Sequence, residues 1–211
     1  EKDRGAQLMA CHRDDTQAWY MAVRRDGYTF TAVNEGEPVL AGDTIAQQRG
    51  IRDPHIFRGP DGAFYLAMTD LHVFGLRDGY RKTEWERGPE YGWGNNRGLV
   101  LMKSWDLIHW NRANIRFDKL SAGLGEIGCV WAPEVTYDDK KGKLMIYYTM
   151  SFKSEANKLY YVYVNDDFNK IESTPQILFE YPMDGVSAID GDITKVGDKY
   201  HLFYVAHDGV G

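Results

Sequence analysis

Short apolar runs separated by polar turns recur along the chain, and the clearest example lies between residues 50 and 68. Residues 56–57 are apolar, a Pro-Asp-Gly turn follows at residues 60–62, and residues 64–68 form a second apolar run. Proline presets φ and glycine tolerates positive φ, so the segment turns tightly between the two runs. The pattern predicts an antiparallel hairpin with Asp53 at its start.

The same arrangement returns twice, in hairpins led by Glu134 and by Asp190. Counted from each of the three acids, the third and the twelfth following residues are apolar or aromatic. A surface carboxylate has no reason to keep such a register with a hairpin. We therefore expect Asp53, Glu134 and Asp190 to occupy one structural position in three copies of a repeated unit.

A second recurring element follows the paired strands: a strand, a polar turn that holds an aspartate, and a short edge strand with an aromatic residue. It occurs at residues 24–30, 103–110 and 164–171. Together the two elements form a four-stranded meander, and strand-only repeats of this size predict a β-propeller. No stretch keeps a helical apolar period, so we expect an all-β chain. The inner strands of a propeller line its channel, which would bring the three acids together.

The repeats also predict the domain organisation. Two full blades fit after Asp53, and a third begins at Asp190 and holds two strands before the sequence ends. The opening segment, residues 7–32, lacks an inner strand led by an acid. We therefore expect residues 1–211 to be a single β-propeller domain that is incomplete at its C-terminus.

The composition fits a globular domain and limits its partners. Hydrophobic residues make up 43% of the chain and charged residues 27%, and the net charge is −6 with acids and bases interspersed. A nucleic-acid site needs a basic face, so we expect no nucleic-acid partner. No apolar run approaches the ~18 residues of a membrane span, so we expect no membrane partner either. Cys11 and Cys129 match no metal-ligand spacing and are expected to be free thiols.

A cluster of carboxylates can bind a hard cation such as Ca²⁺, or it can divide into a general acid and a general base. Glycoside hydrolysis needs the second arrangement, because one carboxylate activates water while a protonated one protonates the leaving oxygen. A sugar site also needs apolar faces and orienting donors. Candidates of both kinds lie near the acids: Trp131, Arg52, His55 and, in the aromatic insert at residues 70–95, Trp85, Tyr91 and Trp93.

Four motifs, in this order, resemble those of glycoside hydrolase family 43. They are Arg-Asp-Pro-His-Ile at residues 52–56, Ser-Trp-Asp-Leu-Ile-His-Trp at 104–110, Trp-Ala-Pro-Glu-Val at 131–135 and Ala-Ile-Asp-Gly-Asp at 188–192. The resemblance covers about residues 50–208. It implies a five-bladed β-propeller, of which this chain would cover the first half to two-thirds. It also implies an inverting hydrolase that releases arabinose, xylose or galactose from polysaccharides.

The resemblance assigns roles residue by residue. Asp53 matches the general base, and Asp190 matches the acid that tunes and orients the proton donor. Glu134 would line the site rather than act as a catalyst. Gly191 stands where the family often has proline, which leaves Asp192 as an alternative to Asp190.

The proton donor of the family is a glutamate in a later blade. No residue here matches it, so we expect it beyond Gly211 and expect the isolated chain to be inactive. We expect the mechanism to require no cofactor. Some members hold a cation in the channel, so a structural Ca²⁺ there stays open, with ligands that this sequence does not identify. The substrate class, an oligosaccharide or a polysaccharide, indicates a secreted or periplasmic enzyme.

Other interpretations stay open. A non-catalytic glycan-binding propeller would keep the channel and its aromatic residues without turning over a substrate. Other enzymes share the architecture: family 32 would need an Asn-Asp-Pro nucleophile before Arg52, and none precedes it. Glycan phosphorylases would need a basic phosphate site, which is not evident in the sequence.

Overall fold

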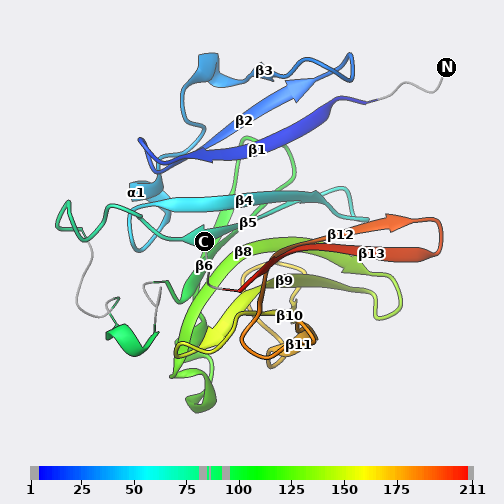
Figure 1. Ribbon diagram of the computed structural model, residues 1–211. Helices are drawn as coiled ribbons and strands as arrows, with labels where there is room; N and C mark the ends of the chain where they lie inside the picture. Colours follow the sequence, from blue (N-terminus) through cyan, green and yellow to red (C-terminus); the bar gives the residue numbers. More distant parts are fainter. Residues whose placement is uncertain (1–4, 81–84, 86, 92–95, 209–211) are drawn as a thin grey trace.

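The computed structural model describes residues 5–80, 85, 87–91 and 96–208. There the chain forms antiparallel sheets that succeed one another along the sequence (Figure 1). The first sheet holds β1 (Gln7–Arg13), β2 (Ala18–Arg24) and β3 (Thr31–Ala32); the second holds β4 (Ile51–Arg58), β5 (Phe64–Asp70), β6 (Gly98–Ser104) and β7 (Asn111–Arg116); the third holds β8 (Ile127–Asp138), β9 (Lys143–Phe152), β10 (Lys158–Val164) and β11 (Gln176–Phe179); the last holds β12 (Ser187–Val196) and β13 (Lys199–His207). These meanders confirm the predicted all-β propeller architecture.

Helical structure in the described segments is short and lies in the connections. It consists of α1 (Gly42–Ile45) and the 3₁₀ turns Asn34–Gly36, Pro89–Tyr91, Phe117–Lys119 and Ala122–Leu124. In these segments no helix has the length and apolar character needed to cross a membrane.

The inner strands of successive sheets lie beside one another although they are far apart in the sequence. β4 contacts β1 on one side and β8 on the other, and β12 contacts β8 and β9. This is the radial arrangement of propeller blades. It places the acid-bearing parts of β4, β8 and β12 next to one another.

Strand β5 shows how the sheets are held face to face. Alternate residues of a strand point to opposite faces, and both faces of β5 are buried. Tyr65 and Ala67 enter a hydrophobic core shared with β8 and β9, whereas Leu66 and Met68 enter a second core shared with β2. A strand buried on both faces needs a nearly continuous apolar run, and the sequence of β5 provides one.

The last strand has a different environment from β5. Phe203, Val205 and Tyr200 of β13 are exposed, Phe203 to 60%. Within the described part of the chain, β13 pairs with β12 alone, so its outer edge carries no partner strand there.

The inner strands β4, β8 and β12 each contain a β-bulge, in which two residues stand opposite one residue of the neighbouring strand. The bulges lie between Arg52 and His55, between Trp131 and Glu134, and between Ile189 and Asp192. Their first residues have positive φ: 48° at Asp53, 44° at Ala132 and 52° at Asp190. A bulge bends its strand and redirects side chains. The bulges therefore decide which side chains the inner strands present at the axis.

The bulges correct one prediction. Asp53 and Asp190 are the first residues of their bulges, but Ala132 holds that position in β8. Glu134 lies two residues further on, level with His55, so the predicted common position is wrong for this acid. Counting along the sequence failed because the hairpin turns differ in length; they close with the pairs Arg58–Phe64, Asp138–Lys143 and Val196–Lys199.

Gly42 allows α1 to lie against the β1–β2 turn and the residue that leads into β4. A Cβ atom on Gly42 would lie 2.1 Å from the backbone oxygen of Gln17 and 2.7 Å from Cα of Gly50. We expect Gly42→Ala to lower the free energy of unfolding by about 1–3 kcal/mol, because backbone atoms would have to shift. Urea denaturation measures the change.

Gly123→Ala is the matched control for this substitution. A Cβ atom on Gly123 would meet no atom within 4 Å, so we expect its unfolding midpoint to stay close to that of the wild type. Equal midpoints for Gly42→Ala and the wild type would contradict the close approach at Gly42.

Candidate active site

The three bulges meet around a cavity of about 270 Å³. Its walls are Asp53, Pro54 and His55 of β4, Ala132, Pro133 and Glu134 of β8, and Asp190 and Gly191 of β12. The cavity thus brings together four of the residues predicted for the site, namely Asp53, His55, Glu134 and Asp190. A concave site with a few converging polar groups is typical of ligand binding.

Each bulge is anchored to the preceding sheet by a hydrogen bond from its backbone. A bulge interrupts the strand ladder, so its amide needs another acceptor. In all three cases a side chain of the preceding sheet accepts this bond. The contacts are Asp53 N–H to His12 Nδ1 (3.1 Å), Ala132 N–H to Thr69 Oγ1 (3.0 Å) and Asp190 N–H to Thr149 Oγ1 (3.2 Å). The neighbouring sheet therefore sets the position of each cavity wall.

Thr69 makes a second contact that fixes the side chain of Asp53. Its hydroxyl donates to Oδ2 of Asp53 at 2.9 Å while it accepts from the amide of Ala132. A hydroxyl can do both, because it carries one proton and two lone pairs. One side chain therefore joins the carboxylate of β4 to the backbone of β8.

Glu134 lies in a setting that favours its protonated form. Its side chain is 23% exposed and accepts a hydrogen bond from the Tyr147 hydroxyl, which itself accepts from the amide of Ile193 at 2.9 Å. Burial, with the charges of Asp192 and Asp190, raises the pKa of Glu134 to about 7, although the bond from Tyr147 opposes the shift. A carboxyl with this pKa exchanges a proton near neutral pH.

His55 is shifted in the opposite direction. Burial lowers the pKa of His55 to about 4, and the charge of Asp192 only partly opposes the shift. The ring is therefore neutral at neutral pH. Its Nδ1 accepts from the amide of Val135 at 3.0 Å, so the proton resides on Nε2, which lies 4.0 Å from a carboxylate oxygen of Glu134.

Asp190 is influenced by the charge of Asp53, the acid at the matching bulge position of β4. Burial raises the pKa of Asp190, and the charge of Asp53 raises it further. A negative charge nearby favours the protonated form of a carboxyl group.

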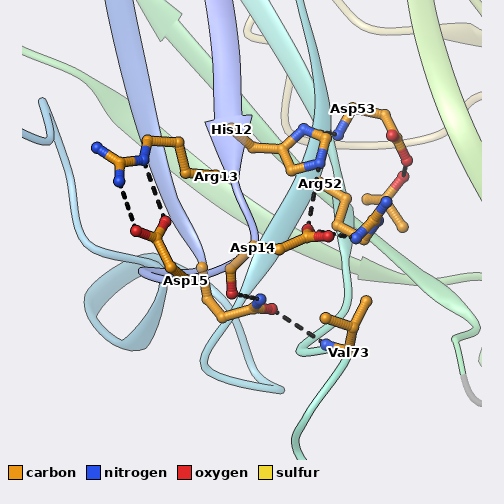
Figure 2. A network of polar contacts seen from close by, with 9 residues as sticks. His12, Arg13, Asp14, Asp15, Arg52, Asp53 and Val73 are labelled. Atoms are coloured by element: carbon orange, nitrogen blue, oxygen red, sulfur yellow. Dashed lines mark hydrogen bonds and ion pairs between the residues drawn. The ribbon is translucent and has the colours of Figure 1, made fainter.

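Arg52 does not line the cavity. Its guanidinium contacts Asp14 of the β1–β2 turn, with Nη1 and Oδ1 2.5 Å apart (Figure 2). The side chain therefore joins β4 to the first sheet, and its predicted contact with substrate stays a prediction.

Trp131 lies on a second, larger cavity of about 710 Å³. This cavity is bounded by Ile189 of β12, by Ser151 of β9 and by Asn157 of the β9–β10 loop. Trp131 and Ile189 directly precede two residues that line the smaller cavity, so the two cavities adjoin along β8 and β12. The buried indole N–H of Trp131 finds no acceptor among the described residues.

The aromatic insert agrees only in part with the predictions. Trp93 lies outside the described residues. Trp85 is 2% exposed and packs under the guanidinium of Arg116, 4.0 Å from the ring centroid, so it cannot be a platform for sugar. Tyr91 lines the larger cavity and donates to Glu126 at 2.8 Å.

Sequence reasoning missed the residues that support the acids. Thr69, Thr149 and Tyr147 are polar groups within apolar strands, and that is the sequence feature that could have drawn attention to them. No feature of the sequence near His12 points to its contact with Asp53.

The metal and thiol expectations have different outcomes. Both Cys11 and Cys129 are free thiols, as predicted. In the described ranges, no group of three or more histidine, cysteine or carboxylate side chains is arranged to hold a metal ion. The expectation of a channel cation in some family members stays a prediction.

The raised pKa of Glu134 makes stability depend on pH. The folded state binds this proton more tightly than the unfolded chain, where the pKa is 4.5. The resulting stabilisation is full below pH 4.5 and is lost as the pH rises through 7. Relative to the wild type, Glu134→Gln should therefore gain stability between about pH 5 and pH 8, by on the order of 2 kcal/mol.

Urea denaturation across this pH range measures the gain. Glu35→Gln is the control, since Glu35 is an exposed glutamate in a turn and the same neutralisation there should leave the pH dependence unchanged. A stability difference between Glu134→Gln and the wild type that stays constant with pH would contradict the assignment.

Comparison with known proteins gives one family match. The family model described as "probable glycosyl hydrolase domain", which is related to glycoside hydrolase family 43, matches residues 8–209. No curated protein sequence matches the chain significantly.

Solved structures share the fold at low sequence identity. They include an α-L-arabinofuranosidase from Clostridium thermocellum (TM-score 0.64, 14% identity, covering 97% of this chain and 58% of that one). An exo-β-1,3-galactanase from Phanerochaete chrysosporium has a TM-score of 0.61 at 9% identity and covers 96% and 41%. A family 32 β-fructofuranosidase from Bombyx mori has a TM-score of 0.58 at 16% identity and covers 94% and 40%. The chain therefore spans little more than half of the arabinofuranosidase, and likeness at these identities shows the fold alone.

Proposed function

Since the chain belongs to the glycosyl hydrolase domain family related to glycoside hydrolase family 43, we propose that the protein hydrolyses glycosidic bonds with carboxylates at the propeller axis. The observation that carries the proposal is that Asp53 and Asp190 hold the same bulge position in two sheets and line one cavity. Neither the family match nor the fold defines the reaction; the two acids supply its chemistry.

In this proposal Asp53 is the general base. The hydrogen bond from Thr69 to Oδ2 orients the carboxylate, and the other oxygen accepts a proton from the attacking water. The water oxygen bonds to the anomeric carbon on the face opposite the leaving group. The bond to the leaving oxygen breaks as that oxygen is protonated, so the sugar inverts its configuration.

Asp190 is proposed to orient and tune the proton donor. Its raised pKa and its electrostatic coupling to Asp53 suit a carboxyl that shares the site with the base. Glu134 has the higher pKa, but it lies beyond the bulge position and is hydrogen-bonded to Tyr147. We assign Glu134 to the cavity wall, with the donor glutamate outside residues 1–211.

The proposed substrate is an arabinose-, xylose- or galactose-containing oligosaccharide or polysaccharide. Trp131 would offer an apolar face to sugar rings in the larger cavity, and Ser151 and Asn157 line the same cavity with groups that can bond hydroxyls. A polysaccharide substrate would place the protein in the periplasm or outside the cell.

Asp53→Asn in the complete gene product tests the role of the base. We expect hydrolysis to fall by roughly 10²–10⁴-fold, because the amide cannot accept the proton of water. The fold should persist, since the amide oxygen can still accept the bond from Thr69. Asp198→Asn, in an exposed turn, is the matched control and should keep wild-type turnover. Wild-type turnover in Asp53→Asn would refute the role.

A panel of nitrophenyl α-L-arabinofuranoside, β-D-xyloside and β-D-galactoside tests the reaction itself. The complete gene product should cleave at least one of them with inversion, and residues 1–211 alone should cleave none. If the complete protein binds glycans and cleaves nothing, the protein is a glycan-binding propeller instead. Retention of configuration or a requirement for phosphate would indicate another enzyme of the same architecture.

A further inference from the structure

The side chain of His12, in β1, contacts the backbone of the candidate base Asp53 (Figure 2). Nδ1 of the imidazole accepts the Asp53 amide at 3.1 Å, and Nε2 lies 3.6 Å from Oδ1 of Asp14. The same oxygen of Asp14 is 2.5 Å from the guanidinium of Arg52. The residue before the base and the amide of the base are therefore both held by the first sheet.

The other bulges show what is unusual about this contact. Ala132 and Asp190 donate their amides to the hydroxyls of Thr69 and Thr149. A threonine hydroxyl accepts a hydrogen bond at any pH of interest. An imidazole nitrogen accepts only while it carries no proton. The bulge that holds the candidate base is thus the one of the three whose acceptor can be switched off by protonation.

The conformation of Asp53 makes the acceptor important. Its φ of 48° lies in the left-handed region, which costs a residue other than glycine about 1–2 kcal/mol. Such a conformation persists where the surroundings fix it. Without an acceptor for its amide, the backbone of the bulge can relax. The bond from Thr69 then holds the carboxylate at Oδ2 alone, and its other oxygen can move away from the water that it must deprotonate. A misplacement of about 1 Å can cost a reaction about 10²-fold.

We propose that His12 is a positioning residue for Asp53: the neutral imidazole holds the bulge in the geometry needed for general-base catalysis, and protonation of the imidazole releases it. This inference rests on the proposed function. At acidic pH the protein would then lose activity through protonation of His12, a residue that does not line the cavity.

The charged groups around His12 fit this assignment. They are Asp14 in the β1–β2 turn, and Arg52 and Asp53 on β4. Burial lowers the pKa of His12 and outweighs the opposing charge of Asp53; Arg52 lowers the pKa further and Asp14 raises it. The ring is therefore neutral at neutral pH, and its Nδ1 is available to the amide.

Two substitutions in the complete gene product separate positioning from packing. His12→Ala removes the acceptor, and we expect the turnover number to fall roughly 10–100-fold while KM stays within about twofold. His12→Asn places an amide oxygen where Nδ1 was, so it should restore most of the turnover. Because this oxygen does not titrate, the acidic limb of the pH profile should move to lower pH than in the wild type.

His109→Asn is the control, since His109 lies in the exposed β6–β7 turn and should leave the profile unchanged. Urea denaturation at neutral pH checks that each variant is folded. Full turnover in folded His12→Ala, or an identical acidic limb in His12→Asn and the wild type, would overturn the inference.

Nuclear magnetic resonance of the ¹⁵N-labelled protein gives a measurement that needs no substrate. A scalar coupling between the Asp53 amide nitrogen and His12 Nδ1 should be present at neutral pH and should vanish as the ring is protonated. Absence of the coupling at neutral pH, or its persistence on the protonated ring, would overturn the inference. If the coupling behaves as expected but the wild type cleaves no glycoside, the proposed function falls while the pH-dependent contact at Asp53 stands.

Discussion

The structure depends on how three interrupted strands satisfy their backbone amides. Each of β4, β8 and β12 breaks its ladder at a bulge, and a buried amide without an acceptor costs about 1–3 kcal/mol. The acceptor comes from the neighbouring sheet in every case, from His12, Thr69 or Thr149. The contact that orients one blade against the next is therefore the same contact that orients the cavity wall.

Burial at the axis acts on each ionisable group according to its chemistry. It raises the pKa of Glu134 and Asp190 and lowers that of His55, so each group moves toward its neutral form. Tyr147 joins Glu134 to the backbone of β12, and His55 accepts from the amide of Val135, so both side chains keep hydrogen-bond partners. The cavity thus concentrates acidic residues without accumulating their full negative charge.

Much of this arrangement follows from local patterns that the sequence displays. Hairpin repetition predicted the blades and the meeting of Asp53, Glu134 and Asp190 in one cavity. It did not predict the position of Glu134, because turns of unequal length disturb any count along the chain. Contacts between sheets, such as that of His12 with Asp53, could not be predicted in this way, because no repeat in the sequence relates the two residues. Trp85 was a candidate sugar platform because no residue near it in the sequence indicates that the guanidinium of Arg116 lies over its ring.

The exposed strand β13 has a consequence for handling this chain as an isolated protein. Its outer edge presents backbone donors and acceptors that pair with no other strand in the described ranges, and apolar side chains such as Phe203 and Val205 flank that edge. An open, apolar strand edge is a template on which another chain can add a strand. In concentrated solution, self-association of the isolated chain should therefore start at β13 rather than at the buried cores around β5.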